Sequence, residues 1–147
     1  RELLLEEISR VFREAASGDT GGGTTWGRVL DSPIEGREFR GQNVMAVLEG
    51  TETYTEPTSP DKLERRLEVD LQTRVYVPRG VELRQGANVV LADMEELIYA
   101  NNLWNGNAVA TRLLANSVSR EDTGDRTVEV TLFMAVQYRT KRTDPRN

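Results

Sequence analysis

The stretch "LERRLEVDLQTRVYV", Leu63 to Val77, alternates apolar and polar side chains over most of its length. Successive side chains of a strand point to opposite faces of a sheet, so this alternation predicts a strand with one buried and one polar face. The predicted buried face carries Leu67, Val69, Leu71, Thr73, Val75 and Val77. The predicted polar face carries Glu68, Asp70, Gln72, Arg74 and Tyr76. In a chain with no His and no Cys, we expect that polar face to present surface rather than chemistry.

Two further strands are predicted near the end of the chain. "AVATRLLANSVS", residues 108–119, and "TVEVTLFMAVQY", residues 127–138, are joined by "REDTGDR". Gly124 supplies a flexible position in that connection, so the pair reads as a hairpin. The remaining residues, 139–147, are polar and are predicted to form a flexible tail.

Two amphipathic helices are predicted from apolar residues at helical spacing. The first lies within residues 1–17, where Leu4, Ile8 and Phe12 share a face, and the second lies within residues 87–104. Shorter strands are expected in "WGRVLDSP", residues 26–33, and "EFRGQNVMAVLEG", residues 38–50, with a glycine-rich loop before them. The expected fold is one α+β domain over residues 1–147, in the order α-β-β-β-α-β-β with long loops. A mostly antiparallel sheet of four to five strands would carry both helices on one face.

The segment "TETYTEPTSPDK", Thr51 to Lys62, separates two of the predicted strands. Its two prolines, Pro57 and Pro60, and its many hydroxyl groups make it too long for a tight hairpin turn. We therefore expect an extended arm that reaches a neighbouring subunit, with Tyr54 among its contacts.

Charge and composition exclude several classes of function. The chain has 19 Lys and Arg against 24 Asp and Glu, a formal net charge of −5, which argues against tight binding to nucleic acid. No run approaches the roughly 18 apolar residues that span a bilayer, so no membrane partner is expected. Without His or Cys there is no imidazole or thiolate ligand and no Ser-His-Asp triad. We expect no enzyme activity, no cofactor and no metal.

Two weaker signals are better explained by structure than by chemistry. "GDTGGGTT" lacks the Lys of a phosphate-binding P-loop and follows a helix instead of a strand, so it reads as a flexible loop. Carboxylates cluster on the second helix and in the 120–126 turn, without the spacing of an EF-hand. These carboxylates are expected to be surface charges. They are Asp93, Glu95, Glu96, Glu121, Asp122 and Asp125.

Several residues are candidates for contact with another subunit or partner. Trp26 and Trp104 border loops and are candidate interface anchors, since aromatic side chains are enriched at binding hot spots; packing in the core or against a loop is the alternative for both. Arg139 forms a basic patch with Lys141 and Arg142 that could contact a phosphate or an acidic neighbour. The full candidate set is Trp26, Tyr54, Pro57, Pro60, Glu68, Asp70, Trp104 and Arg139.

The order of segments resembles the tail terminator proteins of tailed bacteriophages. The similarity covers nearly the whole chain and includes "NVMAVLEGTE", "RRLEVDLQTRVYV", "LADMEELIYA" and a final alternating strand ending in "QYRT". It rests on the order and style of these segments and on no catalytic signature.

The resemblance implies a small α+β subunit that forms a ring, usually of six copies, on the head-proximal end of a completed tail tube. Such a ring stops tube growth and meets the neck or connector of the head, so its partners would be itself, the tail tube protein and the neck protein. Genomic DNA would pass through the opening without tight binding. The location would be the virion, assembled in the bacterial cytoplasm.

Three alternatives stay open at this level. One is a related head-to-tail joining protein of the neck or tail. The second is a non-viral module that recruits a partner by sheet-edge pairing, and the third is a small enzyme that works with carboxylates.

Overall fold

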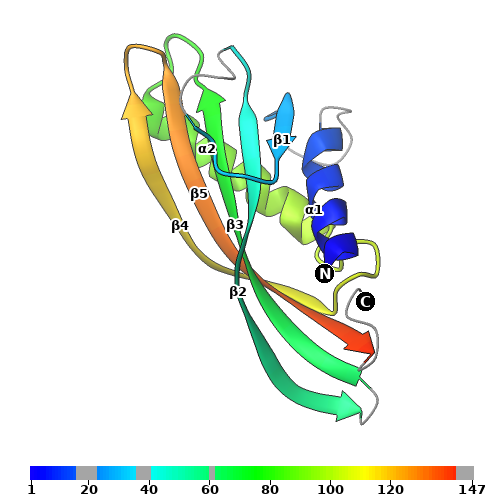
Figure 1. The fold of residues 1–147 in the computed structure, drawn as a ribbon. Helices are drawn as coiled ribbons and strands as arrows, with labels where there is room; N and C mark the ends of the chain where they lie inside the picture. Colours follow the sequence, from blue (N-terminus) through cyan, green and yellow to red (C-terminus); the bar gives the residue numbers. More distant parts are fainter. Residues whose placement is uncertain (16–22, 36–40, 60–61, 142–147) are drawn as a thin grey trace.

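The computed structural model describes residues 1–15, 23–35, 41–59 and 62–141 of the chain. Two helices and five strands follow one another in the predicted order α-β-β-β-α-β-β, so the α+β fold class is confirmed (Figure 1). The elements are α1 (Glu2–Glu14), β1 (Arg28–Leu30), β2 (Val44–Ser59), β3 (Lys62–Tyr76), α2 (Leu83–Ala100), β4 (Ala110–Asp122) and β5 (Thr127–Lys141).

The strands form one sheet in the order β1-β2-β3-β5-β4. β1 runs parallel to β2, from Arg28 opposite Val44 to Leu30 opposite Ala46, and every other pair is antiparallel. The sheet is therefore mostly antiparallel, as expected, and is mixed only because the short strand β1 pairs in parallel. The connection between β1 and β2 is long enough to return the chain to the end from which it started, as a parallel pair requires.

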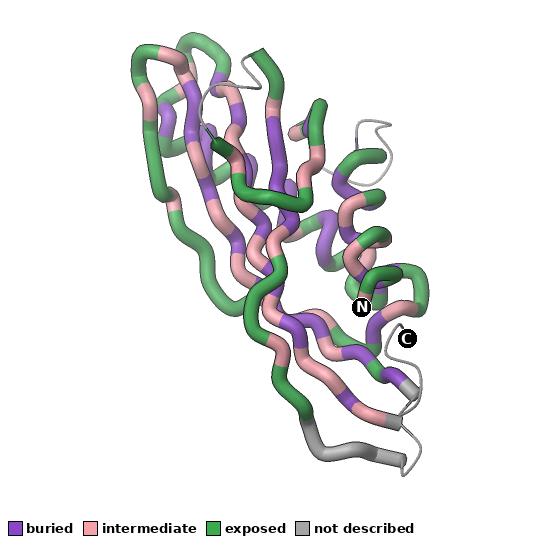
Figure 2. The backbone as a smooth tube through the Cα atoms, in the orientation of Figure 1, coloured by how far each residue is buried: buried purple, intermediate pink, exposed green. Residues whose placement is uncertain are grey.

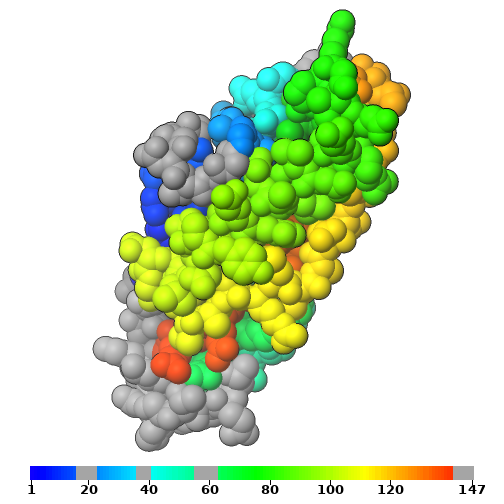
Figure 3. All heavy atoms as spheres, turned by 180° about the vertical axis from the view of Figure 1, so that it is seen from behind, coloured from blue at the N-terminus to red at the C-terminus, as the bar shows by residue number. Residues whose placement is uncertain are grey.

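Both helices pack on one face of the sheet, and the alternation of β3 decides which face that is. The residues of β3 that were predicted to be buried, and Val77 directly after the strand, are all buried, whereas the residues between them are half-exposed. Figure 2 displays this pattern along the strand. α1 buries Leu4, Ile8, Val11 and Phe12 against this face. Seen from the back of the molecule, α2 runs diagonally across the sheet (Figure 3). The opposite face, called the open face below, carries neither α1 nor α2.

α2 begins at Leu83, four residues before the predicted start, because part of the expected polar connection is helical. Gly86 lies in its first turn, where a Cβ atom would meet the Cγ atoms of Val77 at 2.6 and 2.8 Å. The glycine thus allows the helix to approach the end of β3 closely. Asn101 follows the last helical residue and ends the helix, as expected.

The segment Thr51 to Lys62 is not a long loop. β2 continues to Ser59, which pairs with Lys62 at the start of β3, so the two strands form one long hairpin. The prediction of a connection too long for a tight turn is wrong, because Thr and Tyr residues favour strands and the edge of a sheet accepts a proline such as Pro57. Pro60 lies outside the described residues.

The predicted flexible tail is wrong for its first three residues. β5 continues to Lys141, and within it Thr140 is buried. Pairing with the start of β3 extends the strand, since Lys62 lies opposite Lys141. Residues 142–147, and with them Arg142 of the predicted basic patch, lie outside the described part of the chain.

Candidate interface surfaces of the sheet

A hairpin arm extends beyond both helices (Figure 1). It consists of residues 52–59 of β2, 62–67 of β3 and 136–141 of β5, with β3 in the middle. Three paired strands with an apolar face are about the smallest sheet that can be stable on its own. The arm confirms the prediction of an extended structure here, although its geometry is that of a sheet and not of a loop. Its contact with a neighbouring subunit remains a prediction.

Glu52 lies at the base of the arm, on the helix side of the sheet, and collects three donors. The Tyr138 hydroxyl donates to Glu52 Oε1, while Arg65 Nη1 and Arg1 Nη1 approach Oε2 at 3.3 and 3.2 Å. Arg1 also donates to Glu49. This group, called the Glu52 cluster, joins β2, β3 and β5 to the residue that precedes α1. It therefore links the arm to the body of the molecule.

Tyr138 is the buried member of the Glu52 cluster. Burial raises the pKa of its phenol, and the hydrogen bond to the Glu52 carboxylate raises it further. Both effects favour the protonated phenol, which is the form that can donate to Glu52.

Tyr54 is the predicted contact residue that the arm does expose. Its side chain is 66% exposed, and the Arg65 guanidinium lies over its ring, 5.1 Å from the centroid. The cation holds the ring in place at a modest energy, about 0.5 to 1 kcal/mol at exposed sites. An aromatic ring fixed on an exposed strand is suited to contact a partner.

Arg139 lies on the opposite side of the arm, in contact with a carboxylate that sequence reasoning missed. Its Nε donates to Glu64 at 2.9 Å, and Gln137 Nε2 donates to the same carboxylate at 3.0 Å. Glu64 is only 4% exposed, although it belongs to the polar face of β3. The pairing register places Glu64 directly opposite Arg139, and alternation alone did not reveal that contact. Arg139 is thus engaged within the chain.

The open face carries the predicted pair Glu68 and Asp70. In the register of the sheet, Asp70 lies between Leu48 of β2 and Phe133 of β5, and all three are half-buried. Burial raises the pKa of Asp70, and the nearby charge of Glu68 raises it further. This part of the open face is less polar than the sequence alternation suggested.

A segment of the chain's own N-terminal half covers another part of the open face. After β1, the chain crosses in front of β2 and β3 (Figure 1). Ile34 N donates to Gln72 Oε1 at 3.2 Å, and Gly41 N donates to the Tyr76 hydroxyl at 2.7 Å. Ala46, which lies opposite Gln72, is fully buried. The polar side chains of β3 therefore hold this segment, and only part of the open face is free.

The two tryptophans named as candidate interface anchors are core residues, which is the alternative that the sequence left open for them. Trp26 is 2% exposed and donates from Nε1 to Thr73 Oγ1 at 2.7 Å. Trp104 is fully buried and donates to Thr111. Both rings lie near Phe12, with centroid distances of 5.5 and 6.4 Å. They border loops in the sequence because they fix those loops to the core, where each indole N–H has a partner.

Asp93 is also placed differently from the prediction. It is buried, and it accepts hydrogen bonds from the backbone N–H and the hydroxyl of Thr24. Its carboxylate thus fixes the segment before β1 to α2. The prediction that this cluster consists of surface charges is therefore wrong for Asp93. Among the described residues, no group of three or more Asp or Glu side chains is placed to hold a metal ion.

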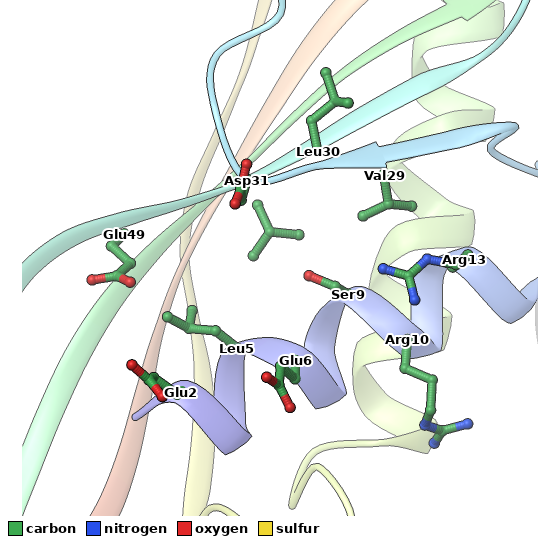
Figure 4. Close-up of a pocket in the computed structure, with 11 residues that line it drawn as sticks. Glu2, Leu5, Glu6, Ser9, Arg10, Arg13, Val29, Leu30, Asp31 and Glu49 are labelled. Atoms are coloured by element: carbon green, nitrogen blue, oxygen red, sulfur yellow. The ribbon is translucent and has the colours of Figure 1, made fainter. Parts of the chain in front are cut away.

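A groove of about 750 Å³ lies between α1 and the edge of the sheet (Figure 4). Leu5 and Ser9 of α1 face Val29 of β1 and Val47 of β2 across it. Charged residues surround these side chains. They are Glu2, Glu6, Arg10, Arg13, Asp31 and Glu49.

No protein-family model matches the chain, and no curated protein matches it. Within the described residues, neither helix has the length and apolar character that crossing a membrane requires.

Proposed function

We propose that the protein is a structural subunit of a ring that caps the head-proximal end of a bacteriophage tail tube and joins the tail to the neck. The hairpin arm is the observation that carries this proposal. It places paired strands beyond the helices, where they can reach a neighbouring copy, and it presents Tyr54 on its surface. The segment order that resembles tail terminators supports the same reading.

A cap on a growing tube needs two different surfaces. A tube grows by stacking identical rings, so growth ends when a ring binds the last surface and offers another one above. This subunit has two dissimilar faces, one covered by helices and one formed by the open sheet, with the arm extending beyond the helices. Such a shape suits a ring that binds a tail tube protein on one side and a neck protein on the other.

Ring closure requires heterologous contacts, in which one patch meets a different patch on the next subunit. The arm provides one such patch, and six copies are the expected number from the resemblance. The formal charge of −5 on each copy disfavours adhesion of DNA, which would have to pass through the opening. The role is structural, without catalysis, and its place would be the virion.

The decisive experiment removes the protein from an assembling particle and examines tails and heads by electron microscopy. Tails of uncontrolled length, not joined to filled heads, are expected. Normal tails joined to heads would contradict the proposal. Tails of correct length that fail to join heads would indicate a head-to-tail joining protein instead.

The mass of the purified chain in solution distinguishes the proposed ring from the alternative of a peptide-binding module. A closed ring is expected from native mass spectrometry. A monomer at all concentrations, combined with binding of a peptide partner, would favour the binding module.

A further inference from the structure

β2 has a free edge along most of its length. β1 pairs only with Val44, Met45 and Ala46, and no other described strand lies on that side of β2. From Val47 onward, the edge of β2 therefore offers unpaired backbone groups to an additional strand.

The direction of these backbone groups follows from one hydrogen bond. Gly27 N donates to Asn43 O at 2.9 Å, so the carbonyl of Asn43 points toward β1 and not toward β3. Backbone groups alternate in direction along a strand, so the N–H and C=O groups of Met45, Val47 and Glu49 point the same way. β1 covers Met45, whereas the outward groups of Val47 and Glu49 border the groove.

The groove lies directly beside this edge and has an apolar centre. Leu5, Val29 and Val47 line it from α1, β1 and β2 (Figure 4). A strand added to β2 at Val47 would direct every second side chain toward α1, into this space. Ser9, on the same face of α1 as Leu5, leaves room for such a side chain.

The charges around the groove favour a basic guest. Arg1 pairs with Glu49, and Arg10 points away from the groove and pairs with Glu7 and Glu14. The carboxylates of Glu2 and Asp31 also line it. Neither makes an ion pair with a described residue. Of the two arginines of α1 that line the groove, Arg13 makes no ion pair with a described residue. The end near Glu2 is therefore acidic.

We propose that the β2 edge beside this groove binds an extended segment of a partner protein that carries an apolar and a basic side chain on one face. Backbone hydrogen bonds to Val47 and Glu49 hold the segment, and the groove selects its side chains. The apolar side chain packs between Leu5 and Val47, and the basic one pairs with Glu2 at the acidic end. This inference does not rest on the tail function, since it concerns only the purified chain.

The probe is an eight-residue peptide that repeats Thr-Val-Thr-Lys, because in a strand it places valine and lysine on one face and threonine on the other. Its binding to the purified chain is measured by fluorescence anisotropy, and amide hydrogen exchange by NMR locates the site. Protection is expected at Val47 and Glu49 and not at β4, the opposite edge of the sheet. A peptide with glutamate in place of lysine should bind at least tenfold more weakly.

Backbone pairing has its own control. The N–H groups of alternate residues point to opposite sides of a strand, so N-methylation of the threonines and N-methylation of the valines and lysines remove different sets of donors. One of the two peptides should lose binding and the other should retain it. If both bind as well as the parent peptide, no strand is added and the proposal fails.

Two variants of the chain, each with a matched control variant, locate the groove. Ser9→Phe fills it and should abolish binding, while Ser9→Ala should bind as before. Glu2→Lys should weaken binding about three- to tenfold, because a surface ion pair becomes a repulsion. Glu96→Lys, the same change on the exposed surface of α2, should have no effect. Urea denaturation confirms that each variant is folded.

Three outcomes would overturn the proposal. They are unchanged binding by both Ser9→Phe and Glu2→Lys, peptide-induced protection at β4 instead of β2, and protection of Val47 and Glu49 without peptide that rises with protein concentration. The last result would show that a second copy of the chain occupies the edge.

Discussion

The Tyr138 hydroxyl donates a hydrogen bond to the Glu52 carboxylate, which joins two residues 86 positions apart in the chain. Tyr138 lies in β5 and Glu52 in β2, on either side of β3. Arg65 of β3 and Arg1 before α1 complete the group. The base of the arm is therefore fixed by side chains from three strands and from the start of the first helix.

Tyr138→Phe should lower the free energy of unfolding by about 1.5 to 3 kcal/mol, the usual cost of losing a hydrogen bond to a charged group. Urea denaturation gives the value. Tyr76→Phe, which removes a hydroxyl that accepts from Gly41, should cost within about 1 kcal/mol. Equal effects of the two variants would show that the Glu52 cluster does not stabilise the arm.

The raised pKa of Tyr138 also predicts how stability depends on alkaline pH. The folded chain keeps this proton above pH 10, the ordinary pKa of tyrosine, whereas the unfolded chain loses it. Stability should therefore fall as the pH rises beyond about 10. The part of the fall due to this phenol should disappear in Tyr138→Phe, and an identical pH dependence in both proteins would contradict the assignment.

Asp70→Asn should stabilise the protein at pH 7. The pKa of Asp70 is raised in the folded chain, so the charged form is disfavoured there, and stability falls as the pH rises above 3.8, its ordinary pKa. The advantage of the variant should shrink below that pH. Urea midpoints from pH 3 to 7 test this, with Asp31→Asn, an exposed aspartate, as the control. A less stable Asp70→Asn at pH 7 would mean that the folded chain favours the carboxylate.

Gly86→Ala should destabilise the fold, because the added Cβ would approach Val77 Cγ2 to 2.6 Å. Overpacking costs about 1 to 3 kcal/mol, and the better helix propensity of alanine offsets about 1 kcal/mol of it. Adding Val77→Ala should relieve the clash, so a double-mutant cycle should give a favourable interaction energy. An additive cycle would show that α2 does not approach β3 this closely.

Trp26→Ala should cost about 3 to 5 kcal/mol, as expected for a buried aromatic residue. Tyr99→Ala, at a side chain that is 70% exposed, should change stability within about 0.5 kcal/mol. Both values come from urea denaturation. A stable Trp26→Ala chain that fails to assemble would restore the interface role that the sequence suggested for this residue.

Tyr54→Ala should leave the fold nearly intact, with a loss within about 1 kcal/mol for the contact with Arg65. Under the proposed function it should weaken ring formation, which sedimentation velocity measures. Tyr99→Ala, at a similarly exposed tyrosine outside the arm, is the matched control. Equal assembly of both variants would remove Tyr54 from the interface.

The sequence by itself determined the order and type of the elements and the buried face of the sheet, although not where each element ends. The alternation in β3 and the helical spacing of Leu4, Ile8 and Phe12 each report local geometry, so each could be read without neighbours. The sequence also limited the chemistry, because a chain without His and Cys lacks their ligands and nucleophiles.

Only the tertiary structure decided which polar residues are surface. Glu64 and Asp93 look like solvated charges in the sequence, but the register and the approach of a distant segment bury them against partners. Trp26 and Trp104 border loops in the sequence, but they are buried in the core. The groove and the free edge of β2 arise because β1 stops after three residues, beside a helix that precedes it in the chain. Such surfaces depend on contacts between residues far apart in sequence, which no local pattern records.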